Sequence, residues 1–162
     1  MAELLEWLEN SPVALMVQES LWGYPIVLSS HAVGMAILVG IVLMINFRVL
    51  GLAPQVPISA LKTMYKIAYI GLVINVISGT MLFVANADAF YESTPFRLKI
   101  ICLIVGTILL VMMSRRIFGP DSSMQDFSPP PRVKLLALLS SIVWIGVIVT
   151  GRLIAYWDWK EF

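Results

Sequence analysis

Charged residues are scarce in this chain. Of its 162 residues, 13% are charged and 59% are hydrophobic, whereas soluble domains average about 25% charged residues. The mean hydropathy of +0.89 is too high for a water-soluble globule, because so much apolar surface could not be covered. The net charge of +1 gives no broad basic field, which argues against nucleic acid as a partner. We therefore predict one integral membrane domain over residues 1–162.

Cysteine and recognisable catalytic motifs are also scarce. The one cysteine, Cys102, cannot form an internal disulfide and is best interpreted as a packing residue. The acidic start of the chain lacks the basic region of a signal peptide, so we expect no cleavage. No nucleophile elbow, no Gly-rich loop after a strand and no carboxylate pair within an apolar run is present. We expect a protein that is not an enzyme, with a redox role through a bound cofactor left open.

Long apolar runs make up most of the sequence. Four of them, at about residues 26–47, 64–85, 98–117 and 135–157, are close to the roughly 20 residues that a membrane-spanning helix needs. Residues 2–20 place Trp7 among acidic and apolar residues, and Ser11 and Pro12 are typical of a helix start. We predict an all-α fold: a four-transmembrane-helix bundle preceded by short N-terminal interfacial helices. The prolines at 129–131 predict an extended third connection.

Lys and Arg residues are distributed unequally between the two sides of such a bundle. The first and third connections share one side and carry seven: Arg48, Lys62, Lys66, Arg115, Arg116, Arg132 and Lys134. The other side carries four: Arg97, Lys99, Arg152 and Lys160. By the positive-inside rule, both termini are predicted to be periplasmic in a bacterial inner membrane.

Small and polar residues interrupt the apolar runs at helical spacing. Small residues let helix backbones approach, and Asn or Ser can hydrogen-bond between helices. The residues expected at such helix contacts are Gly34, Gly71, Asn75, Gly79, Gly106 and Gly151. Asn75 could instead line a cavity.

The only histidine, His31, lies about 8 Å inside the outer end of the first span, at 1.5 Å per residue. An ionisable residue at that depth has either a partner or a function. Counting residues puts several segments at the same level: Ser78 to Met81, Leu98 to Cys102, and Thr150 to Tyr156.

Three interpretations of His31 stay open. A Cu(I) site could use His31, Met35 and Met81, since Cu(I) prefers imidazole and thioether ligands. A b-type haem could use His31 as an axial ligand, with Arg152 at a propionate and Tyr156 nearby. His31 could also be a neutral, hydrogen-bonded packing residue.

Motifs spread over nearly the whole chain resemble those of an uncharacterised family of bacterial four-span inner-membrane proteins, distantly similar in layout to the copper-resistance D membrane proteins. They are Ser11-Pro12, Trp22-x-Tyr24-Pro25, His31-x-x-Gly34, Phe47-Arg48-Val49-Leu50-Gly51, Ser78-Gly79-x-x-Leu82-Phe83, Phe96-Arg97-x-Lys99 and Gly151-Arg152-Leu153-Ile154-Ala155-Tyr156. The resemblance implies Glu, Asp and His at three positions that are Leu28, Asn46 and Ser114 here. If the family site is metallic, this member has lost or weakened it.

These observations favour a non-catalytic membrane subunit that packs against a larger bacterial respiratory or photosynthetic complex. Its expected partners are other membrane subunits and lipid, and a homo-oligomer stays open. The alternative is a copper-handling or b-type haem-binding protein that uses His31. A transporter is disfavoured, because the sequence shows neither a helix break nor a buried charge pair at mid-membrane.

Overall fold

The computed structural model describes residues 2–118 and 129–156. The helices are α1 (Ala2–Glu9), α2 (Pro12–Glu19), α3 (Gly23–Leu50), α4 (Ile58–Ala85), α5 (Ala87–Glu92), α6 (Thr94–Phe118) and α7 (Pro131–Leu153), followed by the 3-10 helix η1 (Ile154–Tyr156). Most of the third connection, and the end of the chain from residue 157, lie outside the described residues.

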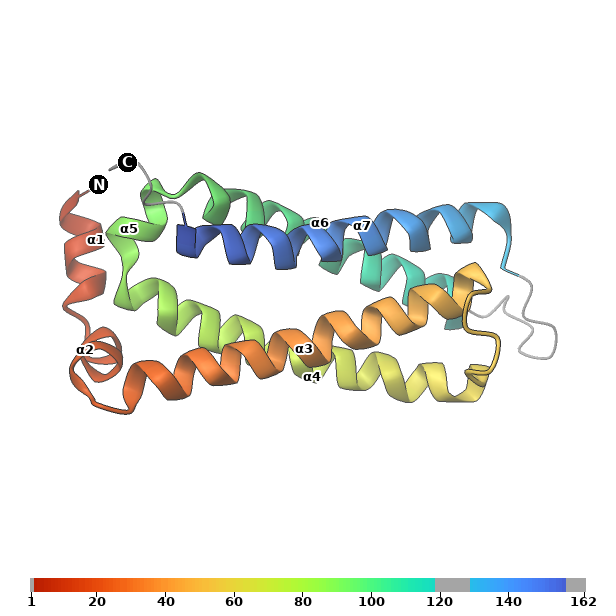
Figure 1. The fold of residues 1–162 in the computed structure, drawn as a ribbon, viewed down its shortest axis with the longest axis horizontal. Helices are drawn as coiled ribbons and strands as arrows, with labels where there is room; N and C mark the ends of the chain where they lie inside the picture. Colours follow the sequence, from red (N-terminus) through yellow and green to blue (C-terminus); the bar gives the residue numbers. More distant parts are fainter. Residues whose placement is uncertain (1, 119–128, 157–162) are drawn as a thin grey trace.

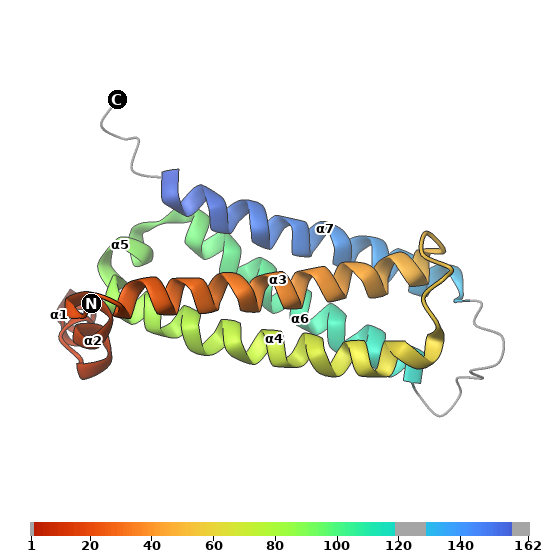
Figure 2. The same cartoon turned by 60° about the horizontal axis from the view of Figure 1, so that its bottom comes forward.

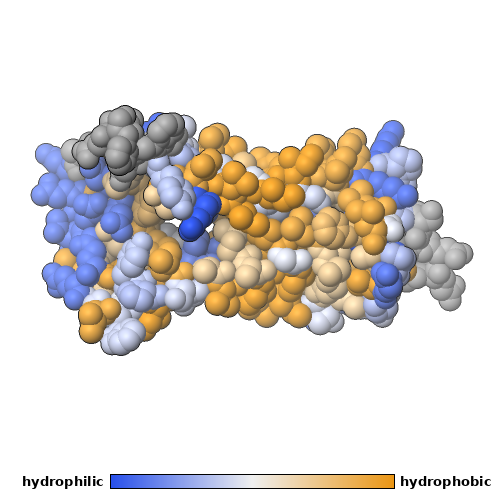
Figure 3. All heavy atoms as spheres, viewed as in Figure 1, coloured by the Kyte–Doolittle hydropathy of each residue, from blue (hydrophilic) through white to orange (hydrophobic). Residues whose placement is uncertain are grey.

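Four helices, α3, α4, α6 and α7, are long and apolar enough to cross a membrane, which confirms the predicted all-α four-span bundle. Figure 3 shows a broad hydrophobic belt around the middle of the molecule, between hydrophilic ends. Each of these four helices begins before its predicted first residue, for example α4 at Ile58 instead of 64. The prediction took the first apolar residue as the start of each span. The helix itself begins earlier, in the polar interface, and in α4 it begins directly after Pro57.

Two short helices precede the spans, as the sequence indicates. Ser11 caps α2 by accepting a hydrogen bond from the Ala14 amide at 3.3 Å. We call the end of the bundle that carries α1, α2 and α5 the terminal end, because α7 also finishes there (Figure 1). α2 is more than a surface helix, since Ala14 and Val17 are fully buried and the Gln18 side chain donates to the Ala85 carbonyl oxygen at 2.6 Å.

The spans pack as two hairpins. α3 packs along α4, α6 packs along α7, and contacts between α3 and α7 join the pairs. In Figure 1, α3 crosses α4 and α6 crosses α7, and Figure 2 shows α3 running alongside α4. A Cβ atom placed on Gly71 would lie 2.8 Å from the main-chain nitrogen of Leu38 and 3.0 Å from the main-chain oxygen of Gly34. A Cβ placed on Gly106 of α6 would lie 2.9 Å from the indole of Trp144 of α7. In each hairpin, therefore, the two helices approach closely at a glycine.

The close approach at Gly71 is testable by adding one methyl group. Gly71→Ala should destabilise the bundle by about 1–3 kcal/mol, because the new Cβ meets backbone that cannot move aside cheaply. Gly40→Ala is the matched control, since a Cβ there meets nothing within 4 Å. The midpoint of unfolding in detergent micelles measures both variants. Equal midpoints for the two would contradict the backbone contact.

Candidate functional site

Three side chains from three helices meet around the only histidine. His31 Nδ1 on α3 lies 3.0 Å from Ser78 Oγ on α4. His31 Nε2 lies 3.3 Å from Lys99 Nζ on α6. We call His31, Ser78 and Lys99 the His31 cluster. It gathers basic and polar side chains inside an otherwise apolar bundle, towards the terminal end.

The hydrogen bonds around Ser78 assign the tautomer of His31. The Ser78 hydroxyl has one proton, and it donates that proton to the Ile74 carbonyl oxygen at 2.6 Å. Towards the imidazole it therefore acts as an acceptor, so His31 Nδ1 carries the proton. The lone pair on Nε2 is then left to accept a hydrogen bond from the Lys99 ammonium.

Two glycines, Gly79 of α4 and Gly151 of α7, lie next to the cluster. A Cβ placed on Gly79 would lie 3.1 Å from His31 Cε1, and one on Gly151 of α7 would lie 3.5 Å from Lys99 Nζ. The imidazole and the lysine chain therefore lie directly against the backbones of α4 and α7. All four spans thus contribute to the surroundings of the cluster.

Asn75 lies one turn before Ser78 on α4. Its side-chain nitrogen donates to the Gly71 carbonyl oxygen at 3.4 Å, and a Cβ placed on Gly34 would lie 2.8 Å from the same nitrogen. Its Oδ1 atom is buried without a hydrogen-bond partner in the described part of the chain. Asn75 therefore packs tightly at the α3–α4 crossing.

The other residues predicted around His31 have contacts of their own. Met35 packs against the main apolar core. Met81 packs against a smaller cluster that includes Val17 and Val27. Arg152 Nη2 lies 3.4 Å from the Tyr156 hydroxyl, and both side chains are exposed. Within residues 2–118 and 129–156, the His31 side chain contacts Ser78, Lys99 and the main chain of Asn75, and it forms no hydrogen bond with Arg152 or Tyr156.

Lys99 is the residue that sequence reasoning missed as a partner of His31. It was counted as an interfacial charge at the start of the third span, although the depth estimate placed 98–102 level with His31. The missing information was the direction of the side chain, because α6 is apolar on most of its circumference. A lysine at the level of a lone histidine is the signal that could have suggested the contact.

A second buried polar contact ties α3 to α7 near the opposite end. Asn46, fully buried, donates from Nδ2 towards Ser140 Oγ and Ser141 Oγ, each at 3.1 Å. Its Oδ1 atom has no hydrogen-bond partner among the described residues. This contact is structural, since it joins two helices deep in the core.

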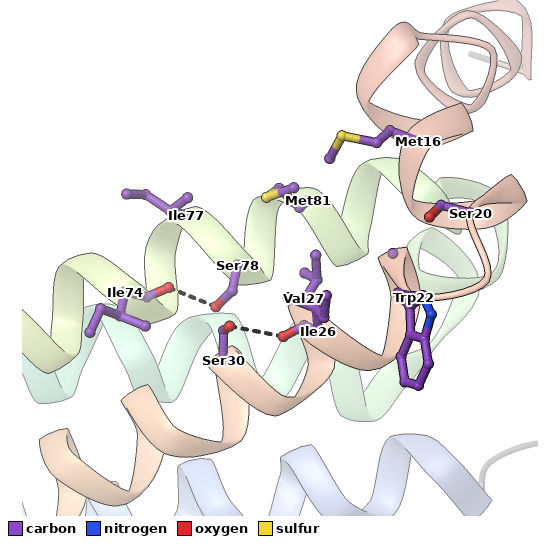
Figure 4. Close-up of a pocket in the computed structure, with 11 residues that line it drawn as sticks. Met16, Ser20, Trp22, Ile26, Val27, Ser30, Ile74, Ile77, Ser78 and Met81 are labelled. Atoms are coloured by element: carbon purple, nitrogen blue, oxygen red, sulfur yellow. Dashed lines mark hydrogen bonds between the residues drawn. The ribbon is translucent and has the colours of Figure 1, made fainter.

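An apolar pocket of about 500 Å³ opens between α2, α3 and α4 beside the cluster (Figure 4). Ser30 and Ser78 are among its lining residues, but their hydroxyl groups donate to the carbonyl oxygens of Ile26 and Ile74 within their own helices. The pocket therefore offers an apolar wall with few free donors. Ser78 alone both lines the pocket and contacts His31.

The chemistry that the cluster offers is cationic hydrogen-bond donation. Among the described residues, no group of three or more His, Cys, Asp or Glu side chains converges. An ammonium faces the unprotonated nitrogen of His31, at the position where a metal ion bound through Nε2 would lie. The arrangement is suited to an incoming group that accepts hydrogen bonds from Lys99.

The tautomer of His31 can be measured directly, because the chain has one histidine. A long-range ¹H–¹⁵N spectrum of the labelled protein in micelles should show Nδ1 protonated and Nε2 unprotonated. In Ser78→Ala the imidazole loses its hydroxyl acceptor, so the preference for Nδ1 protonation should weaken, while Ser114→Ala serves as a distant control. A wild-type spectrum with the proton on Nε2 would contradict the assignment.

Comparison with known proteins places the chain in a family. No curated protein and no solved structure in the comparison matches the chain. The likeness in layout to copper-resistance D membrane proteins stays an expectation. Residues 4–157 match the profile described as a family of unknown function, DUF6644. The chain, over nearly all of its length, belongs to the DUF6644 family.

Proposed function

We propose that this chain is a non-catalytic accessory subunit of a larger bacterial membrane complex, and that it packs against a partner helix through the outward face of α3. The observation that carries the proposal is a row of small residues on that face: Ala32, Ala36 and Gly40, all exposed.

The spacing of these residues makes them one surface. Positions four apart lie on one side of a helix, so the three form a shallow strip along α3. A Cβ placed on Gly40 would meet nothing within 4 Å. At Gly34 and Gly71, atoms of the facing helix already occupy the space of a Cβ, because α3 and α4 cross there. In lipid, small residues favour association because they let helix backbones come close. The strip supports a further helix–helix contact of the same kind.

The membrane and the orientation are part of this proposal. The resemblance favours a bacterial inner membrane. Seven Lys and Arg residues on the side of the first and third connections against four on the other favour a periplasmic terminal end. The contact between Lys99 and His31 takes one of those four charges into the bundle, which makes the asymmetry at the membrane surface larger.

A copper or haem site at His31 is supported less well. Ligation through Nε2 would require Lys99 to move away, and a nearby ammonium repels a metal cation. The orientation of Nδ1 towards Ser78 does fit a ligating histidine, whose second nitrogen is commonly held by a hydrogen bond. The accessory role therefore comes first.

If the α3 strip binds a partner helix, a bulky side chain in the strip should weaken that binding. Ala36→Phe should reduce co-purification of partner subunits from native membranes in mild detergent by about tenfold, which corresponds to roughly 1.4 kcal/mol. The reason is that a bulky ring prevents close approach of a helix to α3. Val73→Phe is the control, because Val73 of α4 is 56% exposed and lies outside the strip.

Two outcomes would contradict the accessory role. One is equal recovery of partner subunits with Ala36→Phe and Val73→Phe. The other is that the wild-type chain leaves the native membrane only as a monomer at every detergent concentration.

A further inference from the structure

We propose that Lys99 forms a binding site for an anionic phosphate group at the terminal end of the bundle. The inference does not depend on a partner at the α3 strip. The phosphate could belong to a lipid headgroup or be free phosphate, and the experiment below distinguishes these sources.

The first step is the position of the Lys99 ammonium. Lys99 is the sixth residue of α6, which puts its Cα about 8 Å along the helix from Thr94. A lysine near a helix end usually extends its ammonium out to the interface. Here Nζ instead lies 3.3 Å from His31 Nε2, in a partly buried position. The ammonium is therefore held inside the bundle instead of in the surrounding water.

The second step is the missing counter-charge. The Lys99 ammonium has three donors, and the hydrogen bond to His31 Nε2 uses one of them. Within residues 2–118 and 129–156, Lys99 forms no ion pair with a carboxylate. A positive charge withdrawn from water without an anion is costly, and a bound anion would offset that cost.

The third step is a second cation at the same end of the bundle, which could reach a bound anion from α7. Gly151 of α7 lies against Lys99, since a Cβ placed there would be 3.5 Å from Nζ. Arg152 follows Gly151 directly, so its Cα lies one residue further along α7, and its side chain leaves the helix about 100° away from the side of Gly151. In the described residues, its side chain contacts Tyr156, through a 3.4 Å hydrogen bond and a ring contact of 5.6 Å. Both contacts are exposed and leave donors of the guanidinium available.

The fourth step is the kind of ligand. Lysine acts as a point charge for phosphate, and arginine donates in a fork that fits phosphate oxygens. A metal cation would be repelled by both side chains. The neutral His31, with its proton directed to Ser78, presents no N–H to the anion and serves to position the ammonium. The terminal end is also where lipid phosphates lie in a bilayer. An anionic phosphate satisfies each of these conditions.

The test uses the full-length chain, stripped of lipid, in a neutral maltoside detergent. The probes are dioleoylphosphatidylglycerol, dioleoylglycerol as its phosphate-free counterpart, and sodium phosphate against sodium chloride at equal ionic strength. The readout is the shift of the thermal unfolding midpoint as each probe is titrated. The variants are compared by this shift and not by their unfolding midpoints without probe, because removal of a buried charge can itself stabilise a protein.

Four chains are compared: the wild type, Lys99→Gln, Lys99→Arg and Lys66→Gln. Lys66→Gln removes the same charge from an exposed position on α4. In Lys99→Gln, the half-maximal concentration of the active probe should rise at least about tenfold, because a charge-assisted hydrogen bond is lost. Lys99→Arg should keep most of the response, and Lys66→Gln all of it.

Each outcome decides the proposal. A shift with phosphatidylglycerol alone identifies a lipid headgroup, and a shift with sodium phosphate identifies free phosphate as a ligand. The absence of a wild-type shift with either probe would overturn the site, even if Lys99→Gln failed to fold. The same shift in Lys99→Gln and the wild type, or an equal response to dioleoylglycerol, would also overturn it.

Discussion

Hydrocarbon offers no hydrogen bonds, so a polar group within the spans needs a partner inside the protein. In the described residues, Asn46 Oδ1, Asn75 Oδ1, the Tyr65 hydroxyl and Trp144 Nε1 are buried without one. Several serine and threonine hydroxyl groups are satisfied locally, by donating to a carbonyl oxygen of the preceding turn of their own helix. The residues that do so are Ser30, Ser78, Thr80, Thr107, Ser114, Ser141 and Thr150. Polar bonds between the spans are few in the described residues, and they occur at His31 and at Asn46.

α3 is central to the bundle because it carries both of these side chains. His31 joins it to α4 and α6 near the terminal end, and Asn46 joins it to α7 near the other end. Between them, Gly34 meets Gly71 at the crossing with α4. These contacts use one side of α3, and the small residues Ala32, Ala36 and Gly40 on its outward side are exposed in the described part of the structure. The accessory role and the phosphate site thus depend on different sides of the same helix.

The sequence predicted the four spans because an uninterrupted apolar run of membrane length has few alternative structures. It also predicted the level of His31, since rise per residue fixes depth. It could not predict that Lys99 turns towards His31, because helices that are apolar all round give no periodicity from which to assign a face. Asn46 was noted only as a departure from a family pattern, and its contact with Ser140 depends on how α3 and α7 rotate against each other.

Four crossings of a lipid bilayer are the claim on which the rest depends, and cysteine labelling measures them most directly. In a Cys102→Ala background, single cysteines at Trp7, Leu52 and Tyr156 are exposed to a membrane-impermeant maleimide before and after the membrane is opened. Trp7→Cys and Tyr156→Cys should label together on one side, and Leu52→Cys on the other. Labelling of all three from one side, or of the first two from opposite sides, would contradict the account.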